Sequence, residues 1–214
     1  MSSPLFIAFE GIDGSGTTTQ CRLLRLRLEQ QFHCTVVATR EPGGTPTAER
    51  IRGLLLDPVL VGLDPLAELL LYAAGRAQHV RERIEPALAA GTPVLCDRYT
   101  ASSVAYQGFG RGLAVDLVEK VNAIAAGDCF PDLSIFLDLP VAQAQERCSL
   151  RATERDRLEM AGVDLQERVR AGYLEIAARN PVVSLVTDSR PPAAEIGDEI
   201  WQALTCKWPG FPFK

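Results

Sequence analysis

Five short apolar runs, separated by longer stretches with helical spacing, constrain the fold of this chain most strongly. They lie at residues 5–10, 35–39, 93–97, 133–139 and 182–187. Four of them are nearly continuous in apolar residues, which is typical of strands that helices cover on both faces. Strands alternating with helices predict an α/β three-layer sandwich with a five-stranded parallel sheet. In such folds, ligands gather at the carboxyl ends of the strands.

The segments between the runs predict the helices and the domain organisation. Apolar residues recur with helical spacing from Leu66 to Ala77, and this helix is expected to continue to about Ala90 and stop at Gly91. The length of 214 residues suits one hydrophobic core. We therefore expect a single domain at residues 1–208. Residues 209–214 form a C-terminal tail, because the ending KWPGFPFK is too rich in proline for regular structure.

Charge and composition exclude several classes of function. The formal net charge of −5 argues against nucleic acid as a partner. The chain has neither an apolar run of roughly 20 residues, which a membrane span requires, nor the pattern of a signal peptide. A cytoplasmic protein without a membrane partner is therefore expected. The six cysteines contain no C-x-x-C pair, which favours buried free thiols over disulfides or a zinc site.

The segment FEGIDGSGTTTQ at residues 9–20 is typical of a phosphate-binding loop that lacks its lysine. The spacing G-x-x-x-x-G alone is weak evidence, because 17 glycines in this chain would produce it about once by chance. An apolar strand leads into the loop and a helix leads out, however, which aims backbone N–H groups at an anion. The members expected to bind ATP phosphates are Gly11, Asp13, Gly14, Ser15, Gly16, Thr17, Thr18 and Thr19. A purely structural turn is the alternative.

Thr17 occupies the position where such loops carry a lysine, so another cation must take over its charge. At an effective dielectric constant near 20, a unit charge about 4 Å from another contributes about 4 kcal/mol. The chain has 19 arginines but only three lysines, all far from the loop in sequence. If the arginine-rich segment at about 147–160 is helical, Arg147, Arg151 and Arg155 share one face and form a lid over the phosphates. A solvated helix is the alternative, since five acidic residues are interleaved.

Six motifs, in order along nearly the whole chain, resemble those of thymidylate kinases. They are FEGIDGSGTTTQ at 9–20, TREPGGT at 39–45, LLYAAGRAQH at 70–79, DRYTASSVAYQGFGRG at 97–112, PDLSIFLDLP at 131–140 and RDRLE at 155–159. The resemblance implies a P-loop kinase of the nucleoside monophosphate kinase type, usually a homodimer. It would transfer the γ-phosphoryl group of ATP to dTMP, with Mg²⁺ as cofactor.

The same resemblance implies roles for individual residues. Tyr72 would stack on thymine and Arg76 would address the base edge, while Ser103, Tyr106 and Gln107 complete the base and sugar pocket. Arg40 and Arg98 would bind the phosphate of dTMP, and Asp13 the sugar 3′-hydroxyl. Asp97 would join Thr18 in the shell of Mg²⁺. Glu41 and the turn at 42–44 would shape the pocket. His79 is interpreted as a hydrophilic helix position, not as a general base, because the acceptor phosphate is already a dianion.

Three functional hypotheses remain open. The first is an active dTMP kinase in which Arg151, with Arg147 or Arg155, replaces the lysine. The second is a nucleotide-binding protein that has lost catalysis and acts as a sensor or partner, which only Thr17 supports. The third is a kinase for another nucleoside monophosphate, such as dUMP.

Overall fold

A computed structural model of the chain describes residues 3–60, 62–150, 157–158, 160, 162–210 and 212. Within this part, five strands form one sheet in the order β2-β3-β1-β4-β5. All four strand pairs are parallel, and Phe6 of β1 faces Val94 of β3, for example. The strands are β1 (Phe6–Glu10), β2 (Val37–Arg40), β3 (Val94–Asp97), β4 (Leu133–Asp138) and β5 (Ser184–Asp188). The predicted five-stranded parallel sheet is therefore confirmed.

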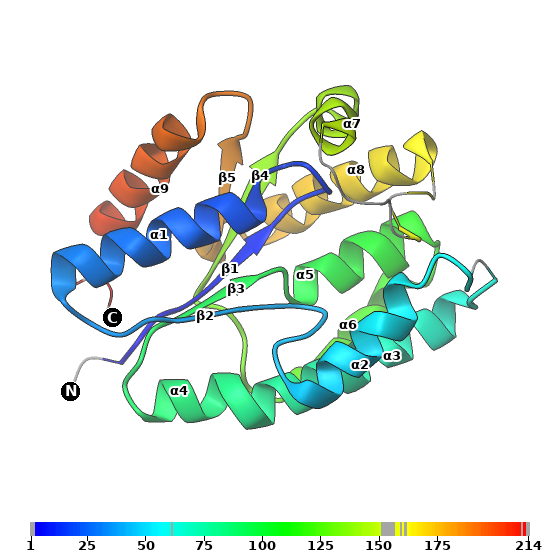
Figure 1. Cartoon of the computed structure of the whole chain (residues 1–214), viewed down its shortest axis with the longest axis horizontal. Coiled ribbons are helices and arrows are strands. Elements are labelled where there is room, and N and C mark those ends of the chain that lie inside the picture. The colour runs from blue at the N-terminus through cyan, green and yellow to red at the C-terminus, as the bar shows by residue number, and fades with distance from the viewer. Residues whose placement is uncertain are drawn as a thin grey trace.

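Helices fill the connections between the strands (Figure 1). The α-helices are α1 (Thr17–Phe32), α2 (Pro46–Leu56), α3 (Pro65–His79), α4 (Glu85–Ala89), α5 (Thr100–Ser103), α6 (Val115–Ala126), α7 (Val141–Ser149), α8 (Val163–Arg179) and α9 (Ala193–Lys207). The π-helical turns η1 (Val80–Ile84) and η2 (Val104–Gly110) extend α3 and α5, and η4 (Pro181–Val183) is a 3₁₀ turn.

Alternating side chains of β1 divide the core into two layers, one on each face of the sheet. Leu5, Ile7 and Phe9 pack with side chains of α1 and α9 on one face, and Figure 1 shows these two helices side by side. Phe6 and Ala8 point to the opposite face, where they pack with side chains of β3, η1 and α6. Because both faces of the strand are buried, its residues are apolar from Phe6 to Phe9, and only Glu10 at its end is charged.

Several element boundaries differ from those predicted. The fifth run was expected to start at 182, but residues 181–183 form η4 and β5 begins at Ser184. The long helix ends at Ala89, and Gly91, with φ of 76°, closes it in the left-handed conformation. Helix α9 ends at Lys207, the first residue of the ending KWPGFPFK, just before the tail predicted at residues 209–214.

The described part of the tail lies against the core. The backbone N–H of Leu5 donates to the carbonyl of Pro212 at 3.2 Å, and Trp208 packs against the α1–α9 layer. All six cysteines are free, as predicted, although Cys206 is exposed and only Cys21, Cys96 and Cys129 are fully buried. Within the described ranges, no helix is long and apolar enough to cross a membrane.

Candidate functional site

The glycine loop connects β1 to α1 at the carboxyl edge of the sheet. Gly14 and Gly16 have φ of 89° and 98°, a region that side chains disfavour. A Cβ atom at Gly14 would also lie 2.5 Å from the carbonyl oxygen of Ala144 on α7. The Ser189 hydroxyl donates to the carbonyl of Ser15, which fixes the loop from the β5 side. The loop therefore requires its glycines, and it ends at the N-terminus of a 16-residue helix that attracts anions.

Thr18 and Asp97 lie together at the mouth of this helix. The Thr18 hydroxyl donates to Oδ2 of Asp97, which ends β3. The second carboxylate oxygen, Oδ1, is buried and has no hydrogen-bond partner among the described residues. Mg²⁺ prefers such hydroxyl and carboxylate oxygens and is often held by one or two carboxylates together with substrate phosphates. Among the described residues, no group of three or more histidines, cysteines or carboxylates is arranged so that it could hold a metal ion. The oxygens of Thr18 and Asp97 are nevertheless of the type that Mg²⁺ binds.

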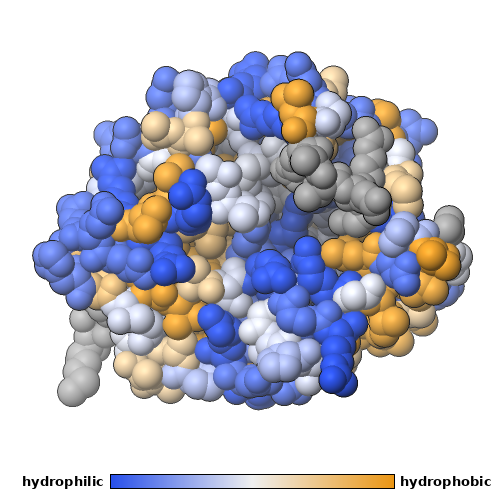
Figure 2. Space-filling model, viewed as in Figure 1, coloured by the Kyte–Doolittle hydropathy of each residue, from blue (hydrophilic) through white to orange (hydrophobic). Residues whose placement is uncertain are grey.

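A cavity of about 250 Å³, here called the loop cavity, opens beside the glycine loop. Figure 2 shows hydrophilic surface gathered around the hollowed middle of this face. Thr17, Thr18 and Asp97 border the cavity on one side. Its cationic border consists of Arg40, Arg52 and Arg98.

Arg52 is a site residue that sequence reasoning missed. Its guanidinium donates to the carbonyl of Pro42 at 2.9 Å, next to the turn at 42–44. Arg50 and Arg52 both lie on α2, and nothing in the sequence indicates which one faces the cavity. The sequence feature that could have indicated Arg52 is its place about two helical turns after the TREPGGT motif.

A second cavity, of about 80 Å³ and here called the aromatic cavity, lies next to the loop cavity. All five residues expected to bind the base and sugar border it: Tyr72, Arg76, Ser103, Tyr106 and Gln107. Asp13, Arg52 and Arg98 border both cavities. Arg40, expected to bind the acceptor phosphate, borders only the loop cavity and pairs with Glu49 at 2.8 Å.

Arg76 is held rigidly at the base of the aromatic cavity. It is 2% exposed, and its Nε donates to Glu41 at 2.8 Å. One terminal nitrogen donates to Asn122 at 2.5 Å, and the other donates to the Tyr99 carbonyl and the Ser103 hydroxyl, each at 3.1 Å. Most of its five donors are thus used within the protein, so the side chain has one fixed orientation toward the cavity.

His79 was predicted to occupy a hydrophilic helix position, and this prediction is wrong. The side chain is fully buried and helps to hold Glu41 in place. Its Nδ1 lies 3.0 Å from Glu41, and its Nε2 lies 2.7 Å from the Thr39 hydroxyl. The polarity of histidine gave the wrong expectation, because paired hydrogen bonds allow a polar ring to be buried. Thr39, His79, Glu41 and Arg76 therefore form a continuous chain from β2 to the aromatic cavity.

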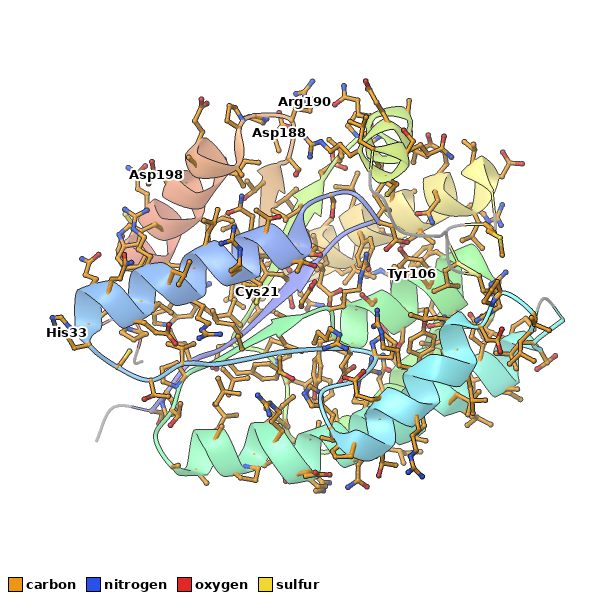
Figure 3. The ribbon with its side chains drawn as sticks, in the orientation of Figure 1. Cys21, His33, Tyr106, Asp188, Arg190 and Asp198 are labelled. Atoms are coloured by element: carbon orange, nitrogen blue, oxygen red, sulfur yellow. The ribbon has the colours of Figure 1, made fainter. Side chains whose placement is uncertain are left out.

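Asp13 and Arg98 connect the glycine loop to the end of β3. Arg98 donates to Asp13 at 2.7 Å and also to the carbonyl of Gly11. The hydroxyl of Tyr106 donates to the other Asp13 oxygen at 3.1 Å; its side chain is labelled in Figure 3. Burial lowers the pKa of Arg98, but its contacts with Tyr106 and Asp13 outweigh this and raise the pKa well above its usual value. The guanidinium therefore remains charged at the boundary of the two cavities.

Glu10, which sequence reasoning did not single out, lies beneath this pair. It is fully buried and accepts hydrogen bonds from the backbone N–H of Tyr99 at 2.9 Å and the Ser102 hydroxyl at 2.6 Å. Burial raises its pKa from 4.5 to about 7, although the hydrogen bond from Ser102 and the charge of Arg98 oppose the shift. Glu10 anchors the segment that carries Arg98, whose φ of 69° is unusual for a residue with a side chain.

The predicted lid is only partly described. Helix α7 ends at Ser149, and Arg151 and Arg155 lie outside the described residues. Arg147 donates to the carbonyl of Ser189 at 2.9 Å. It borders a third cavity of about 450 Å³, here called the outer cavity, together with Gly14, Gly16 and residues 189–193. Arg190, at the rim of this cavity, lies beside Asp188 at the top of Figure 3.

Three further arginines, in the arginine-rich stretch that runs from residue 147 to residue 170, have structural partners. Arg157 is 5% exposed and donates to the Leu55 carbonyl at 2.9 Å. Arg168 donates to the carbonyl of Gly110, and Arg170 forms two hydrogen bonds with Asp138. These three side chains hold helices and turns in place, so the high arginine content of this stretch overstated the number of arginines available for phosphates.

A parallel sheet with a glycine loop between β1 and α1, and a second polar cavity beside that loop, defines a P-loop nucleotide kinase. The chain belongs to the thymidylate kinase family, whose sequence model matches residues 9–200.

Individual relatives support this assignment. The chain is 47% identical over 205 residues to a thymidylate kinase of Deinococcus radiodurans. The aligned region covers 96% of this chain and 98% of that protein. It is 52% identical over 176 residues to a thymidylate kinase of Pelotomaculum thermopropionicum, covering 82% and 81% of the two chains. A crystal structure of thymidylate kinase from Ehrlichia chaffeensis superimposes with a TM-score of 0.75 at 35% identity, covering 94% of this chain and 98% of that one.

Proposed function

We propose that this protein transfers the γ-phosphoryl group of ATP to dTMP, giving dTDP and ADP. The observation that carries this proposal is that Asp13 and Arg98 border both the loop cavity and the aromatic cavity. A donor phosphate in the first cavity and an acceptor phosphate reaching from the second would meet at this boundary. Phosphoryl transfer depends mainly on such positioning and on neutralising charge between the two anions.

On the donor side, the backbone N–H groups of the glycine loop would bind the phosphates of ATP. Thr18 and Asp97 would hold Mg²⁺, which neutralises charge on the donor phosphates when it is bound. The outer cavity would receive the adenosine part of ATP, because it begins at Gly14 and Gly16 and extends away from the acceptor. Arg147 borders that cavity, which supports a contact with the donor nucleotide.

On the acceptor side, the aromatic cavity would take the thymine base and its sugar. Tyr72 offers a stacking face, and Arg76 and Gln107 offer polar groups to the base edge. Arg98, with Arg40 and the newly identified Arg52, would bind the 5′-phosphate. An oxygen of this phosphate attacks the γ-phosphorus while the bond to the β–γ bridging oxygen breaks, and no protein base has to remove a proton.

Arg151, together with Arg147 or Arg155, is our proposed replacement for the missing lysine at Thr17. The support is that neither described lysine, Lys120 or Lys207, borders any of the three cavities. If Arg151 supplies this charge, Arg151→Ala lowers kcat severely and leaves dTMP binding nearly intact. Unchanged turnover would remove the assignment.

A coupled ADP-release assay tests the proposed function. The assay combines ATP and Mg²⁺ with each nucleoside monophosphate in turn, for the wild-type protein and for Thr17→Lys. Turnover of dTMP by the wild type supports the kinase. Turnover only by Thr17→Lys would support the alternative, a nucleotide-binding protein whose catalysis is impaired by Thr17. A higher kcat/KM for dUMP than for dTMP would show that dUMP is the preferred acceptor. Sedimentation of the same samples tests the homodimer that we also propose. We place the reaction in the cytoplasm, where its nucleotide substrates are found.

A further inference from the structure

Glu68 of α3 is a fully buried carboxylate that the proposed reaction has not used. It is 0% exposed, and three side chains converge on it. The amide nitrogen of Gln107 donates to Oε1 at 2.8 Å, and guanidinium nitrogens of Arg157 and Arg111 lie 2.5 and 3.3 Å from Oε2. Two guanidinium groups and one amide N–H face this carboxylate, so both of its oxygens act as hydrogen-bond or ion-pair acceptors.

This constraint fixes the orientation of the Gln107 amide. Because the Glu68 oxygens face donors on every side that the structure describes, the NH₂ end of the amide turns toward Oε1 and the carbonyl oxygen points away. Gln107 borders the aromatic cavity, and its carbonyl oxygen accepts no hydrogen bond from the described residues. The cavity therefore contains a hydrogen-bond acceptor whose position depends on the charge of Glu68.

Ser103 places a hydrogen-bond donor in the same cavity. Its oxygen accepts from Arg76 at 3.1 Å, so its hydroxyl proton is free to point at a ligand. The Gln107 carbonyl oxygen can accept a hydrogen bond from a proton on N3 of a pyrimidine, and the Ser103 hydroxyl can donate to a carbonyl at C4. Cytosine presents the reverse pattern, with a bare N3 and an amino group at C4.

We propose that Glu68 is a positioning residue that determines base specificity: through Gln107, it selects pyrimidines that carry a proton on N3 over cytosine. This proposal rests on the proposed function. The new element is that a residue without substrate contact, Glu68, determines the discrimination between thymine and cytosine through its hydrogen bond to Gln107. A site that hydrogen-bonds one base rejects an analogue that leaves its buried polar groups unpaired. Glutamine at position 68 would allow the Gln107 amide to rotate and accept either base.

The test compares kcat/KM for dTMP and dCMP in the wild type and in Glu68→Gln. We expect the dTMP-to-dCMP ratio to fall at least tenfold, through a higher KM for dTMP and a lower KM for dCMP, with kcat for dTMP nearly unchanged. The exchanged pair Glu68→Gln/Gln107→Glu should restore the preference, because the carboxylate introduced at position 107 would again present only acceptors. A loss of folding alone would not change the ratio of two substrates in this way.

Three controls make the result decisive. Glu175→Gln removes a carboxylate from an exposed ion pair on α8 and should keep the wild-type ratio. Glu68→Asp keeps the carboxylate that balances Arg157 but is one methylene shorter, which lengthens its hydrogen bond to the Gln107 amide. It therefore tests the proposal, with a smaller expected drop, if Glu68→Gln does not fold. In a Gln107→Leu background, Glu68→Gln should change the ratio no further. An unchanged ratio in folded Glu68→Gln or Glu68→Asp would overturn the proposal.

A wild type that turns over no nucleoside monophosphate would refute the proposed function, not this inference. The same variants would then be compared by equilibrium binding of dTMP and dCMP, with the same expected ratios.

Discussion

The Asp13 carboxylate and the Arg98 guanidinium lie 2.7 Å apart and join the glycine loop to the segment after β3. This ion pair places the Arg98 guanidinium where the loop cavity and the aromatic cavity adjoin, the position at which the proposed function brings two phosphates together. Both partners are mostly buried, with side chains 25% and 17% exposed. The geometry of this boundary therefore depends on the planar guanidinium as well as on its charge.

Arg98→Lys is expected to raise KM for dTMP by about tenfold or more, since a lost hydrogen bond to a charged group costs about 1.5–3 kcal/mol. An ammonium group cannot reach Gly11, Asp13 and the phosphate at once. Initial-rate kinetics at saturating ATP measure the change. Arg25→Lys, in an exposed ion pair of α1, is the matched control. A KM for dTMP equal to that of the wild type would contradict the role of Arg98.

Thr18→Val should weaken the apparent affinity for Mg²⁺ by about tenfold, a size typical of altered metal-site shells. The substitution keeps the shape of the side chain but removes the hydroxyl that contacts Asp97. Titration of activity with Mg²⁺ at fixed ATP measures the effect. Thr205→Val on α9, whose hydroxyl bonds only within its own helix, should leave the titration unchanged. An identical Mg²⁺ titration for Thr18→Val would exclude this pair as a metal site.

Arg147→Ala should raise KM for ATP by about tenfold, because the donor cavity loses a charged hydrogen-bonding side chain, while KM for dTMP stays the same. Only KM for ATP should change, because Arg147 borders the outer cavity and not the aromatic cavity. Varying each substrate against saturation of the other separates the two constants. A decrease in kcat without a change in KM for ATP would instead place Arg147 over the transferred phosphoryl group.

Glu10→Gln should make stability less dependent on pH. Burial raises the pKa of Glu10 from 4.5 to about 7, so the folded protein retains a proton that the unfolded chain releases. This contribution is fully present below about pH 4.5 and is lost as pH rises through about 7; it amounts to at most about 3 kcal/mol. The Tm of the wild type should therefore fall relative to that of Glu10→Gln between pH 5 and pH 8.

Thermal unfolding at both pH values measures this difference. Glu29→Gln, which changes a partly exposed carboxylate on α1, is the control and should follow the wild type. A constant difference in Tm between the wild type and Glu10→Gln would show that Glu10 does not hold a proton in this range.

The sheet and the location of the site were predictable from the sequence for one physical reason. Strands buried on both faces must be continuously apolar, and the carboxyl ends of parallel strands share one edge. Residues that end or follow β1, β2 and β3, such as Asp13, Arg40 and Arg98, were therefore expected to lie close together. The structure brings them to the two adjoining cavities.

The helix residues that border or support the cavities were not predictable in the same way. Arg52, Glu68 and His79 lie on helices, and their orientation depends on which helix face packs inward and on partners distant in sequence. Glu68, for example, is paired with Gln107, which is 39 positions away. Hydrophobic spacing identifies the apolar face of a helix, but it does not reveal a charged side chain buried within that face with its partners.

Gly14 leaves no room in the glycine loop for a longer side chain that could supply the charge of the missing lysine. Its α-carbon packs so closely under α7 that any side chain there would collide with the backbone of Ala144. An arginine introduced at position 14 would push α7, and with it Arg147, away from the nucleotide. A positive charge placed in the loop at position 14 is therefore incompatible with the present position of α7.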